Sequence, residues 1–182
     1  MKSEVRIIGG QWKRSKLPVA DKPGLRPTPD RVRETLFNWL GTDLAGWRVL
    51  DAFAGSGALG FEAASRGAAD VLLLESDVAL LRSLAGVKAR LKADAVQVIA
   101  ADALAWLARC APGRFELVLL DPPFEANLFE TALAAAAPMV APGGFLYLEA
   151  PCEFSAPPAG FSRHRHLRAG SVHAHLFARE RG

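Results

Sequence analysis

Residues 51–60 read Asp51-Ala52-Phe53-Ala54-Gly55-Ser56-Gly57-Ala58-Leu59-Gly60. The three glycines have the spacing G-x-G-x-x-G, which ends a strand and opens a helix in folds that bind nucleotide-like ligands. Glycine is required there because the backbone turns tightly and a ligand approaches it closely. The stretch therefore predicts a strand–loop–helix unit with a ligand at the loop, although the same spacing also occurs in dinucleotide-binding folds.

Outward from this loop, short apolar runs alternate with longer amphipathic segments. We expect strands at 48–53, 70–75, 95–100, 115–120 and 144–149, and helices at 59–66, 78–91, 103–110 and 126–140. This alternation predicts a parallel sheet covered on both faces. Two further segments, 161–168 and 172–179, flank Ala169-Gly170-Ser171 and predict an antiparallel hairpin. The predicted fold class is thus α/β and Rossmann-like, with a seven-stranded mixed sheet that ends in this hairpin.

The first 28 residues differ from the rest, because they are rich in Lys, Arg, Gly and Pro and show little core-forming periodicity. Short strands are expected at 5–8 and 12–17. Thr28 as N-cap and Pro29 as the first helical residue predict the start of a helix that ends at Gly41. We therefore expect a basic N-terminal arm or short hairpin at 1–28 and one catalytic domain at 29–182.

The composition excludes several classes of protein. Of the 182 residues 51% are hydrophobic, which argues against global disorder, and the net charge of +3 is only mildly basic. No apolar run is long enough to cross a membrane, and the N-terminus lacks the apolar core of a signal peptide. Cys110 and Cys152 lack metal or redox spacing. We expect a cytoplasmic protein with reduced thiols.

Three acidic residues end or follow three successive predicted strands. Asp51 would repel a pyrophosphate but can receive a cationic amino group, directly or through water. Glu75 can accept both hydroxyls of a ribose, in NAD as in other nucleosides. Asp102 can accept from an adenine amino group, while the N–H of Ala103 meets a ring nitrogen. A ligand with an ammonium, a ribose, an adenine and no phosphate is S-adenosylmethionine, which is the predicted cofactor. The predicted cofactor-binding residues are Asp51, Phe53, Gly55, Ser56, Gly57, Glu75, Ser76, Asp102, Ala103 and Asp121.

The most specific motif of the chain is Asp121-Pro122-Pro123-Phe124, directly after a buried strand. Ligands of open parallel sheets bind beyond the carboxyl ends of strands, where this motif falls. Consecutive prolines offer carbonyl oxygens and no N–H, so Asp121 and the Pro122 carbonyl form a rigid group of acceptors. Phe124 offers a ring on which a base can stack. These four residues are the predicted catalytic set.

The acceptors suit an aromatic exocyclic amine, whose lone pair is delocalised and weakly nucleophilic. Hydrogen bonds from its N–H groups to Asp121 and a carbonyl would position the nitrogen and aim the lone pair at a sulfonium methyl. Rate then comes from positioning and from stabilising charge on nitrogen. Neither a strong general base, a metal nor a nucleophilic cysteine is required.

Several stretches resemble the bacterial 16S rRNA guanine-N2 methyltransferases, which have the class I methyltransferase fold. They are 6–12, 24–28, 30–40, 53–60, 121–124 and 169–173. The resemblance implies S-adenosylmethionine as cofactor and a guanine of 16S rRNA, within a small-subunit RNA–protein assembly, as substrate. One departure is Lys13-Arg14-Ser15, where the family has Arg-Gly-Arg, so the basic character is kept and the glycine is not. We expect a monomer.

Basic residues with an aromatic neighbour gather before the catalytic domain, which is typical of an RNA-backbone contact. The predicted RNA-binding residues are Trp12, Lys13, Arg14, Lys16, Arg26 and Arg31. Arg31 and Arg33 cannot share a helix face, so at most one of them points at a given partner.

Four histidines fall in two pairs, His164 with His166 and His173 with His175. The i, i+2 spacing places each pair on one face of its predicted strand. No carboxylate or cysteine accompanies the pairs at ligand spacing, so no metal site is expected.

Three other functions stay open at this stage. A methyltransferase for adenine or cytosine amines of DNA, or for a protein glutamine amide, would normally carry a larger recognition domain. A silent rRNA-binding or assembly factor would not need Asp51, Asp102 and Asp121. An NAD-dependent reductase is disfavoured by Asp51 and by the proline pair.

Overall fold

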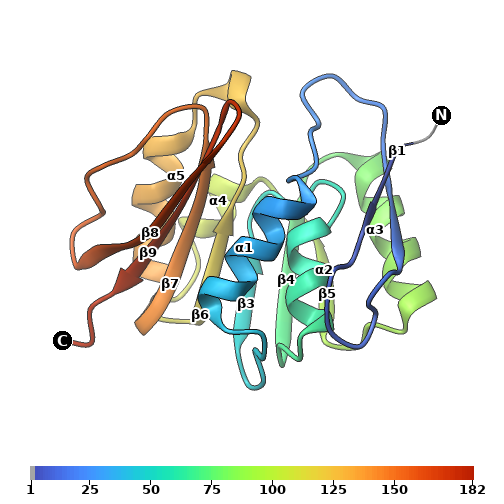
Figure 1. The fold of residues 1–182 in the computed structure, drawn as a ribbon, viewed down its shortest axis with the longest axis horizontal. Helices are drawn as coiled ribbons and strands as arrows, with labels where there is room; N and C mark the ends of the chain where they lie inside the picture. Colours follow the sequence, from blue (N-terminus) through green and yellow to red (C-terminus); the bar gives the residue numbers. More distant parts are fainter. Residues whose placement is uncertain (1–2) are drawn as a thin grey trace.

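The computed structural model describes residues 3–182, which form a seven-stranded sheet flanked by helices (Figure 1). The strands follow the order β5-β4-β3-β6-β7-β9-β8. Strands β3 to β7 are parallel to one another, whereas β9 is antiparallel to both β7 and β8. The predicted fold class is confirmed. The strand bounds are β3 Arg48–Asp51, β4 Asp70–Glu75, β5 Val96–Ala100, β6 Phe115–Leu120, β7 Val140–Ala150, β8 Phe161–Ala169 and β9 Val172–Arg179.

Helices cover both faces of the sheet, because alternate side chains of the strands belong to two separate buried clusters. Helices α1, α2 and α3 pack on one face, and α4 and α5 pack on the other. Within residues 3–182 no helix combines the length and apolar character needed to span a membrane. The helix bounds are α1 Asp30–Leu40, α2 Ala58–Ser65, α3 Val78–Leu91, α4 Ala103–Leu107 and α5 Phe129–Ala136, with 3-10 turns η1 Phe124–Ala126 and η2 Ala137–Met139.

One predicted helix is divided. The helix expected at 126–140 is in fact η1, α5 and η2, and β7 already begins at Val140. Asn127 adopts a left-handed conformation (φ 49°), which a continuous α-helix does not allow. Helix α4 also ends earlier than expected, at Leu107. The apolar periodicity therefore predicted where these helices lie. It did not predict where they end, because the alanine-rich sequence continues beyond them.

The N-terminal arm packs onto the domain as a two-stranded antiparallel sheet, β1 Ser3–Arg6 with β2 Lys16–Val19. Four of its side chains are buried in the cluster that contains α1 and α2, namely Val5, Ile7, Leu17 and Val19. The expectations of little core pattern and of a strand at 12–17 are therefore wrong. Strand β2 alternates exposed and buried residues and β1 buries only Val5, and four residues in each strand are too few for a clear signal. The predicted boundary between the arm and the catalytic domain, after residue 28, stays a prediction. Residues 1 and 2 of the predicted arm lie outside the residues that the structure describes.

A buried charge network fastens this arm to α2. Glu62 is fully buried and accepts the backbone N–H groups of Ile8 (2.8 Å) and Gly9 (2.9 Å). Its carboxylate also pairs with the buried guanidinium groups of Arg33 (3.5 Å) and Arg66 (2.9 Å). Arg33, which the sequence left as a possible partner contact, is thus an internal residue.

The start of α1 differs from the prediction in a way that matters for the site. The helix begins at Asp30 with Pro29 as N-cap, and no side chain caps it. Thr28 is buried, and its hydroxyl lies 3.4 Å from Asp121 Oδ2 instead of on the helix end. The residue that looked like a helix cap therefore belongs to the functional site.

The C-terminal hairpin contains a bulge that separates the histidines. The pairing of β8 with β9 shifts between Arg163 and Arg165. His164 consequently packs against Phe145, whereas His166 packs against His173 and His175 on the opposite face. The expectation that His164 and His166 share a face is wrong, because an extra residue in one strand inverts the alternation after it.

Candidate functional site

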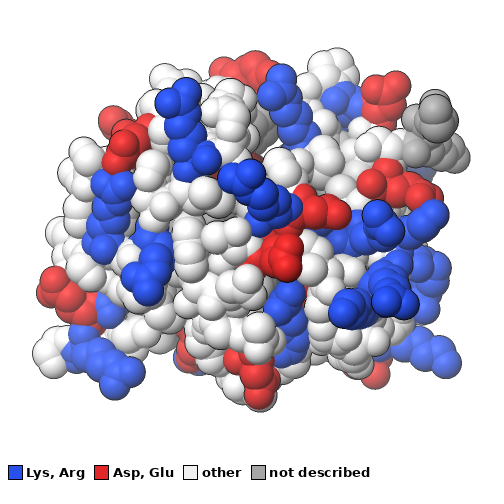
Figure 2. All heavy atoms as spheres, in the orientation of Figure 1, with Lys and Arg blue, Asp and Glu red and all other residues white. Residues whose placement is uncertain are grey.

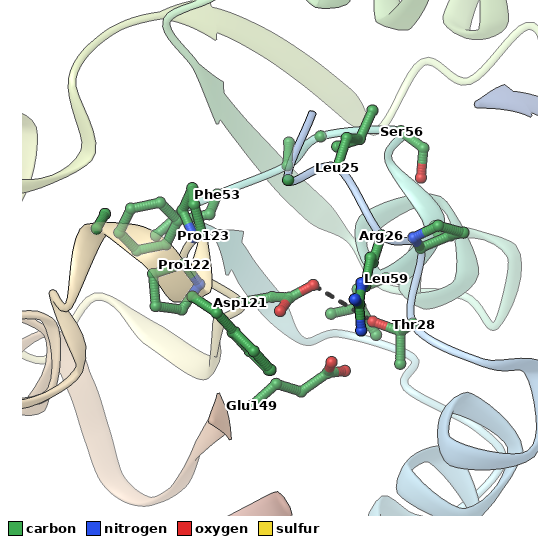
Figure 3. A pocket seen from close by; sticks show the side chains of 18 of the residues that line it. Leu25, Arg26, Thr28, Phe53, Ser56, Leu59, Asp121, Pro122, Pro123 and Glu149 are labelled. Carbon is green, nitrogen blue, oxygen red and sulfur yellow. Dashed lines mark hydrogen bonds between the residues drawn. The ribbon is translucent and has the colours of Figure 1, made fainter. Parts of the chain in front are cut away.

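A cleft of about 870 Å³ opens at the carboxyl ends of the parallel strands, bordered by the segment before α1 and the tip of the C-terminal hairpin (Figure 3). Strands β3, β4, β5 and β6 each end at this cleft, as expected for open α/β sheets. The lining is formed by 22–29, 51–56, 58–59, 74–76, 80, 101–103, 121–126, 128, 149 and 169–172.

The glycine loop connects β3 to α2 and forms one wall of the cleft. Gly55 (φ 56°) and Gly57 (φ 82°) adopt left-handed conformations that other residues rarely accept. Gly55 donates its N–H to Glu75 Oε2 (3.0 Å), which joins the loop to the end of β4. Gly57 does not line the cleft, and a Cβ there would lie 2.5 Å from the Phe61 ring. Glycine at this position leaves room for the side chains of Phe61 in α2 and Leu84 in α3.

Asp51 lies below the glycine loop and is almost completely buried. Its Oδ2 accepts the N–H of Gly60 (3.0 Å), while Oδ1 is the one buried side-chain oxygen or nitrogen within residues 3–182 that has no hydrogen-bond partner. Burial, with a further contribution from the charge of Glu75, raises the pKa of Asp51 to about 7. A cation in the cleft would supply the missing partner of Oδ1 and favour the ionised form.

Two further acids are held in place by backbone N–H groups. Glu75 Oε1 accepts from Ser76 (2.9 Å) and Asp77 (3.0 Å). Asp102 Oδ1 accepts from Ala105 (2.9 Å) and so caps α4. The cap role was not foreseen, but it leaves a second carboxylate oxygen for a ligand and fixes where that oxygen points.

A second group of acids lies across the cleft. Asp121 and Thr28 meet Glu149 at the end of β7, and Figure 3 shows the three side chains converging. Glu149 is buried and accepts a hydrogen bond from the Tyr147 hydroxyl (2.8 Å). Burial together with the charges of Glu149 and Asp51 raises the pKa of Asp121 well above its usual range, and burial also raises the pKa of Glu149. The arrangement favours one proton held between the two carboxyl groups.

The remaining residues of the predicted catalytic motif complete this part of the cleft. Pro122, Pro123 and Phe124 all line it. The Phe124 ring is half-buried and is supported edge-on by Phe129, with 5.7 Å between ring centroids. A planar ligand that enters here meets an aromatic side chain and hydrogen-bond acceptors.

The structure separates the predicted RNA-binding residues into two locations. Arg26 lines the cleft, and Arg31 is exposed in the first turn of α1. Trp12, Lys13 and Arg14 instead form a turn at the far end of α2, where the Trp12 N–H donates to Ser65 Oγ (3.0 Å). Eight helical residues, roughly 12 Å, separate this turn from the glycine loop.

Basic side chains are common on the face that carries α1, and several gather on the side of β1 and β2 (Figure 2). Acidic groups are interspersed, and Lys16 of β2 pairs with Glu4 (3.1 Å). The predicted contact of the arm with RNA stays a prediction, now at a position away from the cleft.

Sequence reasoning missed Glu149 and Thr28 as site residues. Glu149 carries the same signal as Asp51, an acid at the carboxyl end of a buried strand, and that signal could have identified it. Thr28 carried no such signal, because its position before a helix has an ordinary explanation as a cap.

The cleft therefore offers two neighbouring subsites of different chemistry. Asp51, Glu75 and Asp102 suit a ligand with a cationic group, hydroxyls and an amine. Asp121, Glu149 and Phe124 suit a planar ring that carries N–H donors. Asp51 ends β3 and Asp121 directly follows the adjacent strand β6, so the two subsites are neighbours in one cleft.

Comparison with known proteins agrees with this geometry. Residues 5–178 match the model of the family described as conserved hypothetical protein 95. Ribosomal RNA small subunit methyltransferase D of Escherichia coli K12 is 45% identical over 97% of this chain and 91% of that protein. Its counterpart from Haemophilus influenzae is 48% identical over 73% of this chain and 70% of its own length.

Solved structures give the same result. The Escherichia coli protein yhhF superposes with a TM-score of 0.89 at 40% identity, over 99% of this chain and all of the other. Precorrin-6y C5,15-methyltransferase from Geobacter metallireducens shares the fold alone, with a TM-score of 0.70 at 16% identity over 90% of this chain and 95% of that one. The chain is therefore a methyltransferase of the conserved hypothetical protein 95 family, to which ribosomal RNA small subunit methyltransferase D belongs.

Proposed function

We propose that the protein transfers a methyl group from S-adenosylmethionine to the exocyclic N2 amine of a guanine in 16S rRNA of the small ribosomal subunit. The two relatives compared by sequence, from Escherichia coli and Haemophilus influenzae, are ribosomal RNA small subunit methyltransferases, which supports rRNA as the substrate. The observation that carries the choice of base is the pair of carboxyl groups, Asp121 and Glu149, at the inner end of the cleft.

The first subsite fits S-adenosylmethionine. Its ammonium group would meet the unpartnered Oδ1 of Asp51, its ribose hydroxyls would meet Glu75, and its adenine would lie by Asp102 and Ala103. A pyrophosphate would need free backbone N–H groups at the glycine loop, but the N–H of Gly55 already donates to Glu75 Oε2 (3.0 Å). The carboxylate of Asp51 would also repel it. These contacts favour this cofactor over NAD.

The second subsite fits the donor edge of guanine. Guanine presents N1–H beside its N2 amino group, so neighbouring positions on this edge are all donors. Adenine presents its amino group beside a bare ring nitrogen, which is an acceptor. Asp121 and Glu149 can together accept from both guanine positions, and Pro122 has no N–H that would compete. An adenine presents an acceptor beside its amino group, so it would fit only while the two carboxyl groups keep their shared proton, whereas guanine can supply donors to both carboxylates.

The chain contributes positioning and electrostatic stabilisation to the reaction. When bound, S-adenosylmethionine supplies a methyl group activated by its sulfonium. Asp121 and the Pro122 carbonyl would hold the N–H groups of N2 so that the nitrogen lone pair faces that methyl group, and Phe124 would stack on the base. Positive charge develops on N2 in the transition state and is stabilised by the carboxylate of Asp121. The methylated nitrogen is then very acidic and passes a proton to Asp121 or to water, so a strong base is unnecessary.

The substrate is expected within a small-subunit RNA–protein assembly, and the enzyme is expected to act as a monomer in the cytoplasm, where this assembly forms. Arg26 at the cleft can contact the phosphates next to the target base, while Trp12, Lys13, Arg14 and Lys16 can contact RNA further away.

Nucleoside mass spectrometry of 16S rRNA tests the proposal. A strain that lacks the gene should lose one N2-methylguanosine, and the wild-type gene should restore it while the Asp121→Asn gene should not. Loss of a methylated adenosine or cytidine instead would refute the choice of base. Unchanged rRNA would mean that the chain is silent or acts on another substrate.

A further inference from the structure

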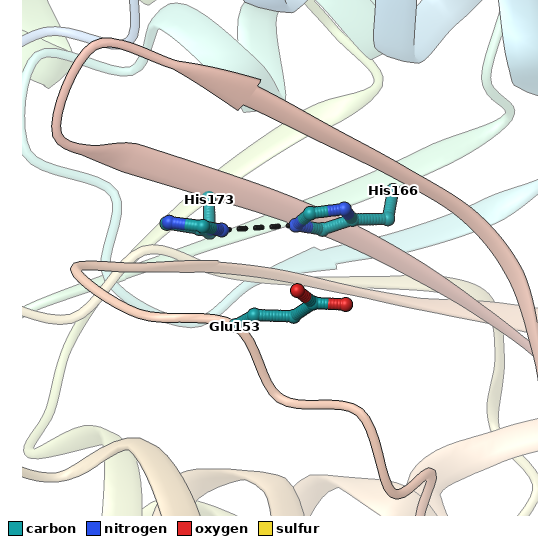
Figure 4. Close-up of side chains that lie close together, drawn as sticks. All are labelled: Glu153, His166 and His173. Atoms are coloured by element: carbon teal, nitrogen blue, oxygen red, sulfur yellow. Dashed lines mark hydrogen bonds between the residues drawn. The ribbon is translucent and has the colours of Figure 1, made fainter.

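Three side chains from three separate segments meet on one face of the C-terminal hairpin. Glu153 lies in the loop after β7, His166 on β8 and His173 on β9, and Figure 4 shows the carboxylate facing the two rings. Their ligand atoms all lie within 4.8 Å of one another, and His166 Nε2 is 3.0 Å from His173 Nδ1. This cluster is separate from the cleft, because none of the three residues lines it.

We propose that Glu153, His166 and His173 bind a divalent transition-metal ion of the zinc type. Imidazole nitrogen and carboxylate oxygen are the ligands that zinc takes in proteins, and two histidines with one glutamate leave a fourth position for water. Magnesium and calcium prefer sites made of oxygen alone, so the two imidazoles argue against them. No carboxylate lies near the histidines in the sequence at the spacing of metal ligands. In the structure Glu153, from the loop after β7, supplies one.

The two histidines are placed to act as ligands, whereas their neighbour His175 is not. His175 already uses both ring nitrogens, because Nε2 accepts the N–H of Phe154 (2.9 Å) and Nδ1 lies 3.1 Å from the carbonyl oxygen of Leu148. The facing nitrogens of His166 and His173 contact each other instead. At this distance one of the two nitrogens donates its proton to the other. When both nitrogens bind a metal ion, the ion replaces that proton, which is released.

His175 also positions the third ligand. Its bond to Phe154 holds the loop against the hairpin at the residue next to Glu153. The Glu153 side chain is exposed, and its Oε1 pairs with Arg163 (2.7 Å) on the same face. A carboxylate has two oxygens, so one can keep Arg163 while the other binds the ion. Ligand atoms about 2.0–2.2 Å from zinc lie roughly 3–4 Å apart, so a cluster whose ligand atoms lie within 4.8 Å of one another needs to contract by only about 1 Å.

A bound ion would tie the loop at 151–160 to both strands of the hairpin. The tip of that hairpin, 169–172, lines the cleft, so the ion would stabilise one border of the substrate site from outside. This role is structural and asks nothing of the ion in methyl transfer.

Titration calorimetry of the untagged, EDTA-treated full chain with zinc chloride tests the proposal. Wild type should bind one zinc ion, and His166→Gln, His173→Gln and Glu153→Gln should each bind it at least about 10-fold more weakly. His164→Gln is the matched control, since it removes a histidine from the same strand on the other face. Cys152→Ser controls for the exposed thiol beside Glu153. Both controls should bind zinc like wild type.

Thermal unfolding separates ligand loss from damage to the fold. Zinc should raise the melting temperature of wild type and of both controls, but not of His166→Gln, whose melting temperature in EDTA should stay close to that of wild type. Equal zinc affinity in wild type and His166→Gln would overturn the proposal. So would a loss of binding in His164→Gln or Cys152→Ser as large as the loss in His166→Gln.

Discussion

The carboxyl groups of Asp121 and Asp51 are largely removed from water. Hydrogen bonds from the surrounding protein offset only part of the free-energy cost of burying their charged forms. Both lie at the carboxyl ends of parallel strands, beside a cleft that accepts a ligand. Burial raises the pKa of each of them. Such groups are unfavourable in the empty protein and gain partners when ligands bind, which is typical of functional sites. Each gives a prediction at the scale of a single residue.

Asp121→Asn should lower kcat by roughly 10²-fold or more, because the variant keeps the size of the side chain but loses the charge that, in the proposed function, stabilises the reacting nitrogen. Affinity for S-adenosylhomocysteine should change little. Single-turnover methylation of small-subunit RNA, with calorimetric titration of S-adenosylhomocysteine, measures both. Methylation at the wild-type rate would place the chemistry elsewhere.

Asp51→Asn should change the pH dependence of stability in the cofactor-free protein. The pKa of Asp51 is about 7 in the folded chain and near 3.9 when unfolded. Between these values the folded state keeps a proton that the unfolded state releases, so the free energy of unfolding of wild type falls as pH rises through this window. The fall amounts to a few kcal/mol, since each pKa unit corresponds to about 1.4 kcal/mol.

Urea unfolding at pH 5 and pH 8 measures this effect. The free energy of unfolding of Asp51→Asn minus that of wild type should be larger at pH 8 than at pH 5. The affinity of the variant for S-adenosylhomocysteine should drop. Asp94→Asn, an exposed turn residue, serves as the control and should follow the wild-type profile. A wild-type profile for Asp51→Asn would show that the carboxylate is better solvated than its burial implies.

At the scale of elements, the arm illustrates how short strands become part of a core. Strands β1 and β2 have four residues each and would not be stable alone. They are held by burial of apolar side chains and by Glu62, which binds the arm backbone and two buried arginines. The loss of one partner from such a network leaves other charges buried without compensation.

Glu62→Gln should therefore destabilise the protein by about 3–5 kcal/mol, the range for breaking a buried ion pair from one side. Urea unfolding measures the loss, and hydrogen exchange should be faster at the amides of Ile8 and Gly9. Glu4→Gln, which removes the exposed partner of Lys16, should cost within about 0.5 kcal/mol. Equal effects of the two substitutions would mean that the arm is not anchored through α2.

At the scale of the whole molecule, the predicted RNA-binding residues fall into two regions, one near the cleft with Arg26 and one beyond the far end of α2. The arm can therefore contribute to RNA affinity without touching the reacting base. The side chains of Lys13, Arg14 and Lys16 are exposed, although the backbone between them is packed.

Replacing Lys13, Arg14 and Lys16 together with glutamine should raise the KM for the ribosomal substrate. Each lost phosphate contact should also reduce the slope of log affinity against log salt by about 0.7–0.9. The melting temperature should stay near wild type, because these are surface substitutions. RNA binding at several salt concentrations measures the slope. An unchanged slope would assign the RNA surface to other residues, with Arg26 as the first to test.

The sequence by itself determined the fold class, the edge of the sheet at which the cleft opens, and the acids, prolines and glycine loop in its lining. Glycine spacing, proline pairs and apolar periodicity act over a few neighbouring residues, so they can be read locally. Strand β4, helix α3, strand β6 and strand β9 have the expected bounds for this reason. Residues at the carboxyl ends of neighbouring parallel strands lie at the same edge of the sheet, independently of how the loops pack. For this reason the sequence could predict that Asp51, Glu75, Asp102 and Asp121 line one cleft.

Only the tertiary structure decided which residues from distant segments complete these sites. Thr28 and Glu149 join Asp121 across 93 and 28 positions of the chain, and Glu153 joins two histidines through a loop. The bulge in β8 places His164 on the face of the hairpin opposite to His166. The short strands β1 and β2 pack the arm, which the sequence predicted to be peripheral, against the core. These outcomes depend on long-range packing and on the register of strand pairs, where a shift of one residue changes which face a side chain occupies.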